Sequence, residues 1–192
     1  MIKTHLPIIL ASGSPRRKIL LEQMKLPFKV LKVDIDESFK RGEKPITIVK
    51  RLAKNKLDKA LETRTGGIFI TADTIVVLKG KVIGKPRDKK DAERILKLLS
   101  GNTHAVYTGF AVYNSLNGKL IIDYEKTLVK FRKLTIGEIR EYISGGSPMD
   151  KAGAYGIQDD YGAVFIKNIN GCYYNVVGLP LTKLYQALLR IM

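Results

Sequence analysis

The sequence has one cysteine, no tryptophan and only two histidines among its 192 residues. Because a disulfide needs two cysteines, Cys172 has no partner within the chain, and a cytoplasmic location is the expectation. Zinc sites are built mainly on cysteine and histidine, so His5 and His104 alone argue against one. Any bound metal is therefore expected to be a hard divalent cation on carboxylate oxygens.

Long apolar runs are also absent. None approaches the ~20 residues that a transmembrane helix needs, so no membrane partner is expected. Residues 1–7 lack the apolar core and small-residue cleavage site of a secretory signal. With 45% hydrophobic and 27% charged residues, the chain has the composition of a globular protein with a sizeable core. The length fits one domain, or two closely joined lobes.

Acidic residues are scarce relative to basic ones: 18 against 34, which gives a net charge of +16. This excess favours anionic partners, namely nucleotides, nucleic acid or acidic surfaces, without choosing among them. The lysines are spread along the chain and form no long basic block, so solvated surface also accounts for much of the charge.

A phosphate-binding pattern stands near the N-terminus. The apolar run 8–11 is followed by Ser12, Gly13, Ser14, Pro15, Arg16 and Arg17. Pro15 suits the first position of a helix and Ser14 suits the cap before it, so the pattern predicts a strand, a turn and a helix. We expect Ile19, Leu20 and Met24 on the apolar face of that helix. Its free N–H groups and two guanidinium groups can hold a phosphate, although an ordinary βα unit with solvated arginines fits the spacing equally well.

Three carboxylates, Asp34, Asp36 and Glu37, follow an expected strand at residues 28–32. In a protein this basic they have two interpretations. One is a loop that caps and solvates itself; the other is a set of ligands for Mg²⁺ or Mn²⁺.

Residues 45–62 have the clearest helical periodicity. Their apolar stripe consists of Val49, Leu52, Ala53, Leu57, Ala60 and Leu61. Lys56 lies two turns after Val49 and so projects from the same face. Such a lysine either extends to solvent or meets an anion in a cleft, and the pattern leaves both open.

Asp73 lies between two apolar runs, 67–71 and 75–78, which are expected to be separate strand segments. A buried carboxylate needs partners, so Asp73 is either a hydrogen-bonded anchor or a catalytic or metal-binding group. Its expected position at a strand end favours the second interpretation.

The remaining pattern mixes helices and hairpins. We expect a helix at 89–99 capped by Asp88, strands at 103–114 and 119–134, a helix at 135–144, a functional glycine-rich loop at 145–158, strands at 163–169 and 172–177, and a closing helix over 181–189. Early alternation followed by hairpins predicts an α/β fold with a mixed sheet.

Together these residues resemble the Maf family of nucleoside triphosphate pyrophosphatases over nearly the whole chain. The motifs that carry the resemblance are Ser12-x-Ser14-Pro15-Arg16-Arg17, the acidic Glu37, Leu52-Ala53-x-x-Lys56, Thr71-Ala72-Asp73-Thr74 and Gly84-Lys85-Pro86-x-Asp88. Thr71 is a departure, because the family usually has glycine there, and we expect it to be tolerated.

The resemblance implies a mixed, twisted β-sheet flanked by helices, of the Maf or ITPase-like type. It implies a single domain, residues 1–192, of two lobes with the nucleotide in a central cleft. The implied reaction is hydrolysis of the α–β phosphoanhydride of a nucleoside triphosphate to the monophosphate and pyrophosphate, a house-cleaning activity on nucleotide pools. A homodimer is expected from the family only.

The resemblance also distributes roles among residues. It gives catalytic roles to Glu37, Lys56, Asp73 and Lys85, and substrate binding to Ser12, Arg16, Arg17, Thr74 and Gln158. Glu37 and Asp73 would hold Mg²⁺, Mn²⁺ or Co²⁺, and Asp73 is the candidate base for the attacking water.

The segment 150–158 is similar to the branch of the family that acts on dTTP and UTP, whereas a sister branch prefers 7-methyl-GTP. Arg16, Thr74 and Gln158 occupy the positions associated with the base preference. The alternative function is a non-catalytic regulatory protein that binds nucleotides or nucleic acid. Nucleic acid is disfavoured because the tyrosines fall mainly in expected strands and helix faces instead of alternating with basic residues.

Overall fold

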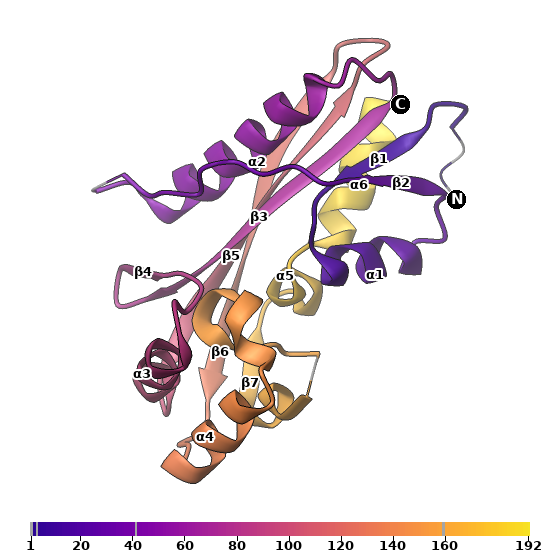
Figure 1. Ribbon diagram of the computed structural model, residues 1–192. Helices are drawn as coiled ribbons and strands as arrows, with labels where there is room; N and C mark the ends of the chain where they lie inside the picture. The colour runs from indigo at the N-terminus through magenta and orange to yellow at the C-terminus, as the bar shows by residue number, and fades with distance from the viewer. Residues whose placement is uncertain (1, 3, 41, 159) are drawn as a thin grey trace. The chain divides into compact units, whose positions relative to one another are not determined.

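The computed structural model of the protein describes residues 2, 4–40, 42–158 and 160–192. Its elements are, in chain order, β1 (Ile8–Ala11), α1 (Pro15–Gln23), β2 (Phe28–Leu31), α2 (Pro45–Leu61), β3 (Ile68–Leu78), β4 (Lys81–Ile83), α3 (Lys89–Leu99), β5 (Thr103–Asn114), β6 (Leu120–Phe131), α4 (Ile136–Ser144), the 3₁₀ turns η1 (Ser147–Asp150), η2 (Ala152–Ala154) and η3 (Asp160–Phe165), β7 (Ile166–Asn170), α5 (Tyr173–Val177) and α6 (Leu181–Ile191) (Figure 1).

The strands form one mixed sheet in the order β2-β1-β3-β5-β6-β7, with β4 paired to β3. β1 runs parallel to both β2 and β3, whereas β4 and β7 pair antiparallel with their neighbours. The predicted α/β fold with a mixed, twisted sheet and flanking helices is confirmed.

Two compact units divide the chain. Unit 1 comprises Met1–Asp73, Thr108–Glu125 and Gly178–Met192, and unit 2 comprises Thr74–Tyr107 and Lys126–Val177. β3, β5 and β6 each run from one unit into the other. The prediction of one domain whose two lobes enclose a cleft stays a prediction.

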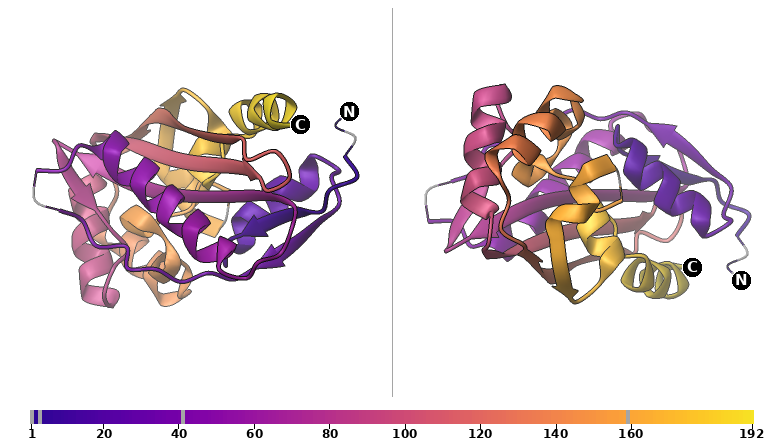
Figure 2. Two further views of the ribbon diagram at one scale, coloured as in Figure 1. Left: turned by 90° about the horizontal axis from the view of Figure 1, so that it is seen from above. Right: turned by 90° about the horizontal axis from the view of Figure 1, so that it is seen from below.

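In unit 1, α2 and α1 cover opposite faces of the strands (Figure 2). The α2 face buries a cluster made of Ile9, Ala11, Ala53, Leu57, Ala60, Phe69 and Ala111. Gly109 on β5 permits the close approach of α2, because a Cβ there would lie 2.4 Å from the Val49 carbonyl carbon. Thus a glycine on the sheet sets how near the helix that carries Lys56 can come.

The start of α1 is as predicted, with Pro15 in the first turn and Ser14 accepting a hydrogen bond from the Arg17 backbone. Its expected apolar face was wrong in part, because Leu20 is buried and Met24 half-buried as expected but Ile19 is not. Ile19 is 49% exposed, and the buried side chains are Arg17, Leu20 and Leu21. These three share one stripe at i, i+3 and i+4, which apolar periodicity alone misses because its first member is charged.

β3 is one strand of 11 residues, so the expected break on either side of Asp73 was wrong. Asp73 lies in the middle of this strand and not at its end. The buried strand continues through it, since every β3 residue except the half-buried Thr74 is buried.

Unit 2 confirms the Asp88 cap of α3 and the helix Ile136–Ser144. The expected strand at 172–177 was wrong, because Tyr173–Val177 forms the short helix α5. This turn buries Asn175, whose side-chain amide donates to Val106 O at 3.1 Å and to Thr127 Oγ1 at 3.0 Å. These tertiary contacts outweigh the β propensity of the sequence Tyr-Tyr-Asn-Val-Val.

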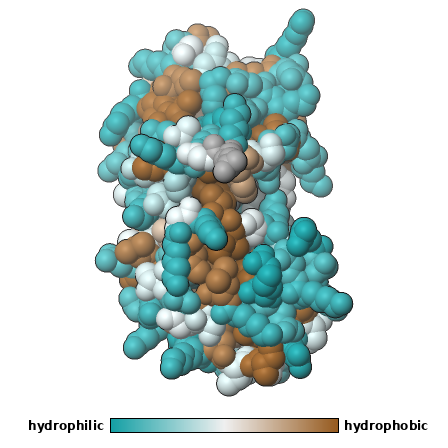
Figure 3. Space-filling view, turned by 90° about the vertical axis from the view of Figure 1, so that its left-hand side faces the viewer, coloured by the Kyte–Doolittle hydropathy of each residue, from teal (hydrophilic) through white to brown (hydrophobic). Residues whose placement is uncertain are grey.

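In the part of the chain that the structure describes, no helix is both long enough and apolar enough to cross a membrane. The face drawn in Figure 3 is mostly hydrophilic, with apolar side chains gathered in smaller patches.

Candidate active site

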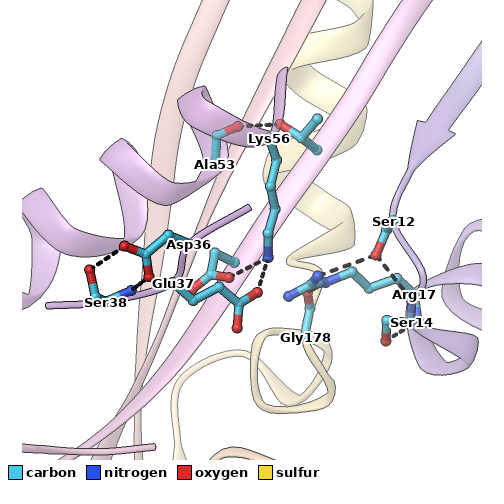
Figure 4. Close-up of polar contacts among 11 residues, drawn as sticks. Ser12, Ser14, Arg17, Asp36, Glu37, Ser38, Ala53, Lys56 and Gly178 are labelled. Atoms are coloured by element: carbon cyan, nitrogen blue, oxygen red, sulfur yellow. Dashed lines mark hydrogen bonds and ion pairs between the residues drawn. The ribbon is translucent and has the colours of Figure 1, made fainter. Parts of the chain in front are cut away.

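The turn after β1 is organised around the Ser12 hydroxyl. Ser12 Oγ accepts a hydrogen bond from Ser14 N at 3.2 Å and another from an Arg17 terminal nitrogen at 3.3 Å. Arg17 Nε donates to Gly178 O at 2.9 Å, just before α6 (Figure 4). Arg17 therefore ties the turn to a distant segment of unit 1.

Arg17 is a buried cation and Arg16 is half-buried. Burial lowers the pKa of the Arg17 guanidinium, and the negative charges of Asp73 and Glu37 oppose that shift. The alternative of a solvated arginine is wrong for Arg17.

Lys56 extends from α2 towards the same carboxylates. Its Nζ lies 2.7 Å from Glu37 Oε1 and 2.5 Å from Asp73 Oδ1, and the whole residue is only 7% exposed. Figure 4 shows the Lys56 ammonium beside Glu37. Of the two interpretations of this lysine, extension to solvent is excluded.

In the acidic segment 34–37, the interpretation as a self-capping loop holds for Asp36, and the interpretation as a set of metal ligands stays a prediction. Glu37 reaches Lys56, whereas Asp34 is exposed. Asp36 caps its own loop by accepting from Ser38 N at 2.9 Å and from Ser38 Oγ at 2.8 Å. These hydrogen bonds from Ser38 lower the pKa of Asp36. Only one of the three carboxylates therefore belongs to the cluster around Lys56.

Thr71 fixes the distance between β3 and α2. Its buried hydroxyl donates to Ala53 O at 2.7 Å, one turn of helix before Lys56 and two strand residues before Asp73. Because Thr71 and Asp73 are two apart in a strand, they face the same helix. The residue that departs from the family pattern is thus built into the support of the Lys56–Asp73 pair.

Thr74 is the next residue of β3 and is half-buried. Strand alternation directs the Asp73 and Thr74 side chains to opposite faces of the sheet. The assignment of both residues to one site therefore stays a prediction.

Two further predicted site residues belong to unit 2. Lys85 is exposed, and it follows Gly84, whose carbonyl accepts from Gly153 N at 3.1 Å. Gln158 is half-buried, and its buried Oε1 has no hydrogen-bond partner among the residues that the structure describes. That Lys85 and Gln158 act with the unit 1 residues stays a prediction.

No group of three metal-binding side chains was found among the described residues. Glu37 and Asp73 nevertheless both contact the Lys56 ammonium. Two hard oxygen donors therefore lie close together beside one positive charge. Mg²⁺ is commonly held by one or two carboxylates plus water and substrate phosphates. The pair fits such a cation, with the remaining ligands supplied by the substrate and water.

Sequence reasoning missed two supporting groups. The role of the Gly178 carbonyl could not be predicted, because every residue has a backbone carbonyl and no residue type indicates which one accepts a hydrogen bond. Thr71 did give a signal, since a β-branched hydroxyl residue replaced the family's usual glycine, but its contact with Ala53 could only be seen in the fold.

Comparison with known proteins identifies the family to which the chain belongs. The chain is 48% identical over 188 residues to a protein of Clostridium botulinum (strain 657 / Type Ba4) named dTTP/UTP pyrophosphatase, with 96% of each chain covered. Proteins of the same name from Geobacter sp. (strain M21) and Geotalea uraniireducens (strain Rf4) are each 47% identical, with coverage of 94% and 100% of this chain and 93% and 98% of theirs. The model of the family described as Maf-like protein matches residues 7–191, and the chain belongs to that family.

Proposed function

We propose that this protein hydrolyses dTTP, UTP and related or modified pyrimidine triphosphates to the nucleoside monophosphate and pyrophosphate. The observation that carries the proposal is the buried Lys56 ammonium between Glu37 and Asp73. The near full-length similarity to proteins named dTTP/UTP pyrophosphatase supports the same activity.

The reaction needs an activated water and compensation of phosphate charge. In our proposal, the Asp73 carboxylate accepts a proton from water as the water oxygen attacks phosphorus. The α–β anhydride bond breaks, and pyrophosphate leaves with the bonding electron pair. Because Asp73 lies mid-strand and is buried, it would meet this water with little freedom to move.

The cations have separate roles in the proposal. Lys56 pairs with Asp73 before substrate binds and donates to a phosphate oxygen once substrate is present. Arg16, Arg17 and Lys85 bind the phosphates, together with Ser12 and the N-terminus of α1. The buried Arg17 and its hydrogen bond to Ser12 support this part of the proposal.

Glu37 and Asp73 would hold a divalent cation, which we propose to be Mg²⁺, Mn²⁺ or Co²⁺. When bound, such a cation neutralises charge on the phosphates. The half-buried Glu37 comes from the irregular segment between β2 and α2, so its carboxylate can adjust to a cation more readily than that of Asp73.

Gln158, with Thr74 and Arg16, is proposed to select the base. Uracil and thymine both carry an imide N–H, which can donate to Gln158 Oε1, an atom without a partner among the described residues. Cytosine has no hydrogen at that ring nitrogen, so it would leave the buried oxygen unpaired. We also propose a cytoplasmic location, a homodimer and no nucleic-acid partner.

The test offers purified protein a panel of nucleoside triphosphates with Mg²⁺, Mn²⁺ or Co²⁺ and measures pyrophosphate and monophosphate. We expect release from dTTP and UTP, with little from CTP or GTP and none in EDTA. Nucleotide binding without any pyrophosphate release would favour the non-catalytic alternative and overturn the proposal.

A further inference from the structure

We infer that the His104–Tyr155 side-chain pair positions the base-recognition segment, residues 153–158, and so contributes to selection of uracil and thymine. The inference rests on the proposed function and extends it to residues that lie away from the substrate. His104 comes from β5, and Tyr155 precedes Gln158 by three residues.

The pair is a polar contact inside an apolar core. His104 Nε2 lies 2.7 Å from the Tyr155 hydroxyl, and the two residues are 2% and 5% exposed. Phe131 meets both rings edge-on, with centroids 5.1 Å from His104 and 4.8 Å from Tyr155. Each ring is thus held by the other two, which fixes the orientation of Tyr155.

Two further contacts hold the same segment. Gly153 N donates to Gly84 O at 3.1 Å, and Gly156 N donates to the Tyr142 hydroxyl at 3.3 Å. Gly153 has φ of +75°, and a Cβ there would lie 2.9 Å from a Val76 methyl carbon. The segment is therefore attached near residues 153, 155 and 156, although its last four residues belong to no regular helix or strand.

Packing alone does not require these polar groups. A phenylalanine at 155 would fill the same space, whereas burying a hydroxyl against an imidazole is favourable only while both are paired. The hydrogen bond adds directionality to the packing. It fixes how far the Tyr155 ring extends into the core, as well as the plane of the ring. Such precision matters three residues later, where the Gln158 amide oxygen, unpartnered within the described part of the chain, must meet one N–H of a base.

The experiment compares Tyr155→Phe with wild type and with the control Tyr185→Phe, which removes a hydroxyl from a 40% exposed tyrosine on α6 in unit 1. For each protein, kcat/KM is measured with UTP and with CTP, and the inhibition constant of inorganic triphosphate is measured alongside. Thermal unfolding and circular dichroism verify folding. Tyr142→Phe is a second, independent variant, which removes the hydrogen bond from Gly156 N to the Tyr142 hydroxyl.

We expect Tyr155→Phe to lower the ratio of kcat/KM for UTP over CTP by about tenfold, the equivalent of one misplaced hydrogen bond. Inhibition by triphosphate, which has no base, should be unchanged. In a Gln158→Ala background, adding Tyr155→Phe should leave the ratio unchanged, because the tyrosine acts through Gln158.

An unchanged ratio in folded Tyr155→Phe protein would overturn the inference. An equal reduction in the Gln158→Ala background would also overturn it, by showing an effect that bypasses Gln158. Failure of the proposed function is distinguishable, because wild-type protein would then release no pyrophosphate from any pyrimidine triphosphate.

Discussion

The Lys56 ammonium on α2 and the Asp73 carboxylate on β3 form a buried ion pair of 2.5 Å. The same helix carries an exposed pair of nearly equal length, Lys54 with Asp58 at 2.6 Å. The two pairs share residue types and differ in burial. They therefore allow the effect of burial to be separated from that of contact.

Lys56→Met should lower the free energy of unfolding by about 3 kcal/mol, because it leaves a buried carboxylate without its counter-charge. Lys54→Met should change it by no more than about 0.5 kcal/mol, as for other exposed helix pairs. Urea unfolding in EDTA, which prevents a metal from replacing the ammonium, measures both. Similar losses from the two variants would show that Lys56 is solvated in solution.

Asp73→Asn should reduce kcat by about 10²-fold or more, since an amide cannot accept the proton of the attacking water. The dissociation constant of a non-hydrolysable UTP analogue should change much less, because the arginines and lysines that bind the phosphates remain and the asparagine oxygen can still ligate a divalent cation. Single-turnover rates and calorimetry provide the two numbers. Asp58→Asn on the exposed face of α2 is the matched control, and equal losses of turnover and binding in Asp73→Asn would remove its role as base.

Arg17→Lys should raise KM by about tenfold while the protein stays folded. A lysine keeps the charge but lacks the planar fork that reaches Gly178 O and Ser12 Oγ together. Steady-state kinetics with UTP measure the effect. Lys18→Ala, at the neighbouring exposed position, should behave like wild type. A wild-type KM in Arg17→Lys would mean that charge alone suffices at this position.

Stability should fall as the pH drops from 6.5, because burial lowers the pKa of His104 to about 4. The folded state keeps this imidazole neutral, whereas the unfolded chain takes up a proton below its ordinary pKa, so acid favours unfolding. Between pH 7 and 5 the loss should be about 2 kcal/mol. Denaturant midpoints at both pH values measure it.

His104→Gln should flatten this dependence and His5→Gln should leave it intact, since these are the chain's two histidines. The window lies above the ordinary pKa range of aspartate and glutamate, so carboxylates contribute little there. A dependence that persists in His104→Gln would assign it to other groups.

The starts of α1 and α3 could be predicted from the sequence because local interactions determine them. Ser14, Pro15 and Asp88 have cap or first-turn chemistry that depends on few neighbours. Lys56 was identified because it breaks an apolar stripe. These signals need no knowledge of the tertiary fold.

The errors arose where distant parts of the chain decide local structure. The buried contacts of Asn175 turn residues 173–177 into a helix, and the Lys56 counter-charge lets Asp73 continue a strand. The partners of Asn175 and of Asp73 are distant in sequence, so local periodicity could not reveal these contacts. The charged member of the face that α1 buries was missed for a similar reason, because Arg17 is paired with the carbonyl of Gly178.

The two carboxylates around Lys56 belong to different kinds of backbone. Asp73 lies in the middle of a strand, whereas Glu37 lies in an irregular segment. Strand interiors open rarely, whereas irregular segments fluctuate on nanosecond to microsecond timescales. Amide hydrogen exchange should therefore be slow at residue 73 and fast around residue 37. The Asp73 carboxylate then keeps a fixed position, while the Glu37 carboxylate can move towards an arriving cation.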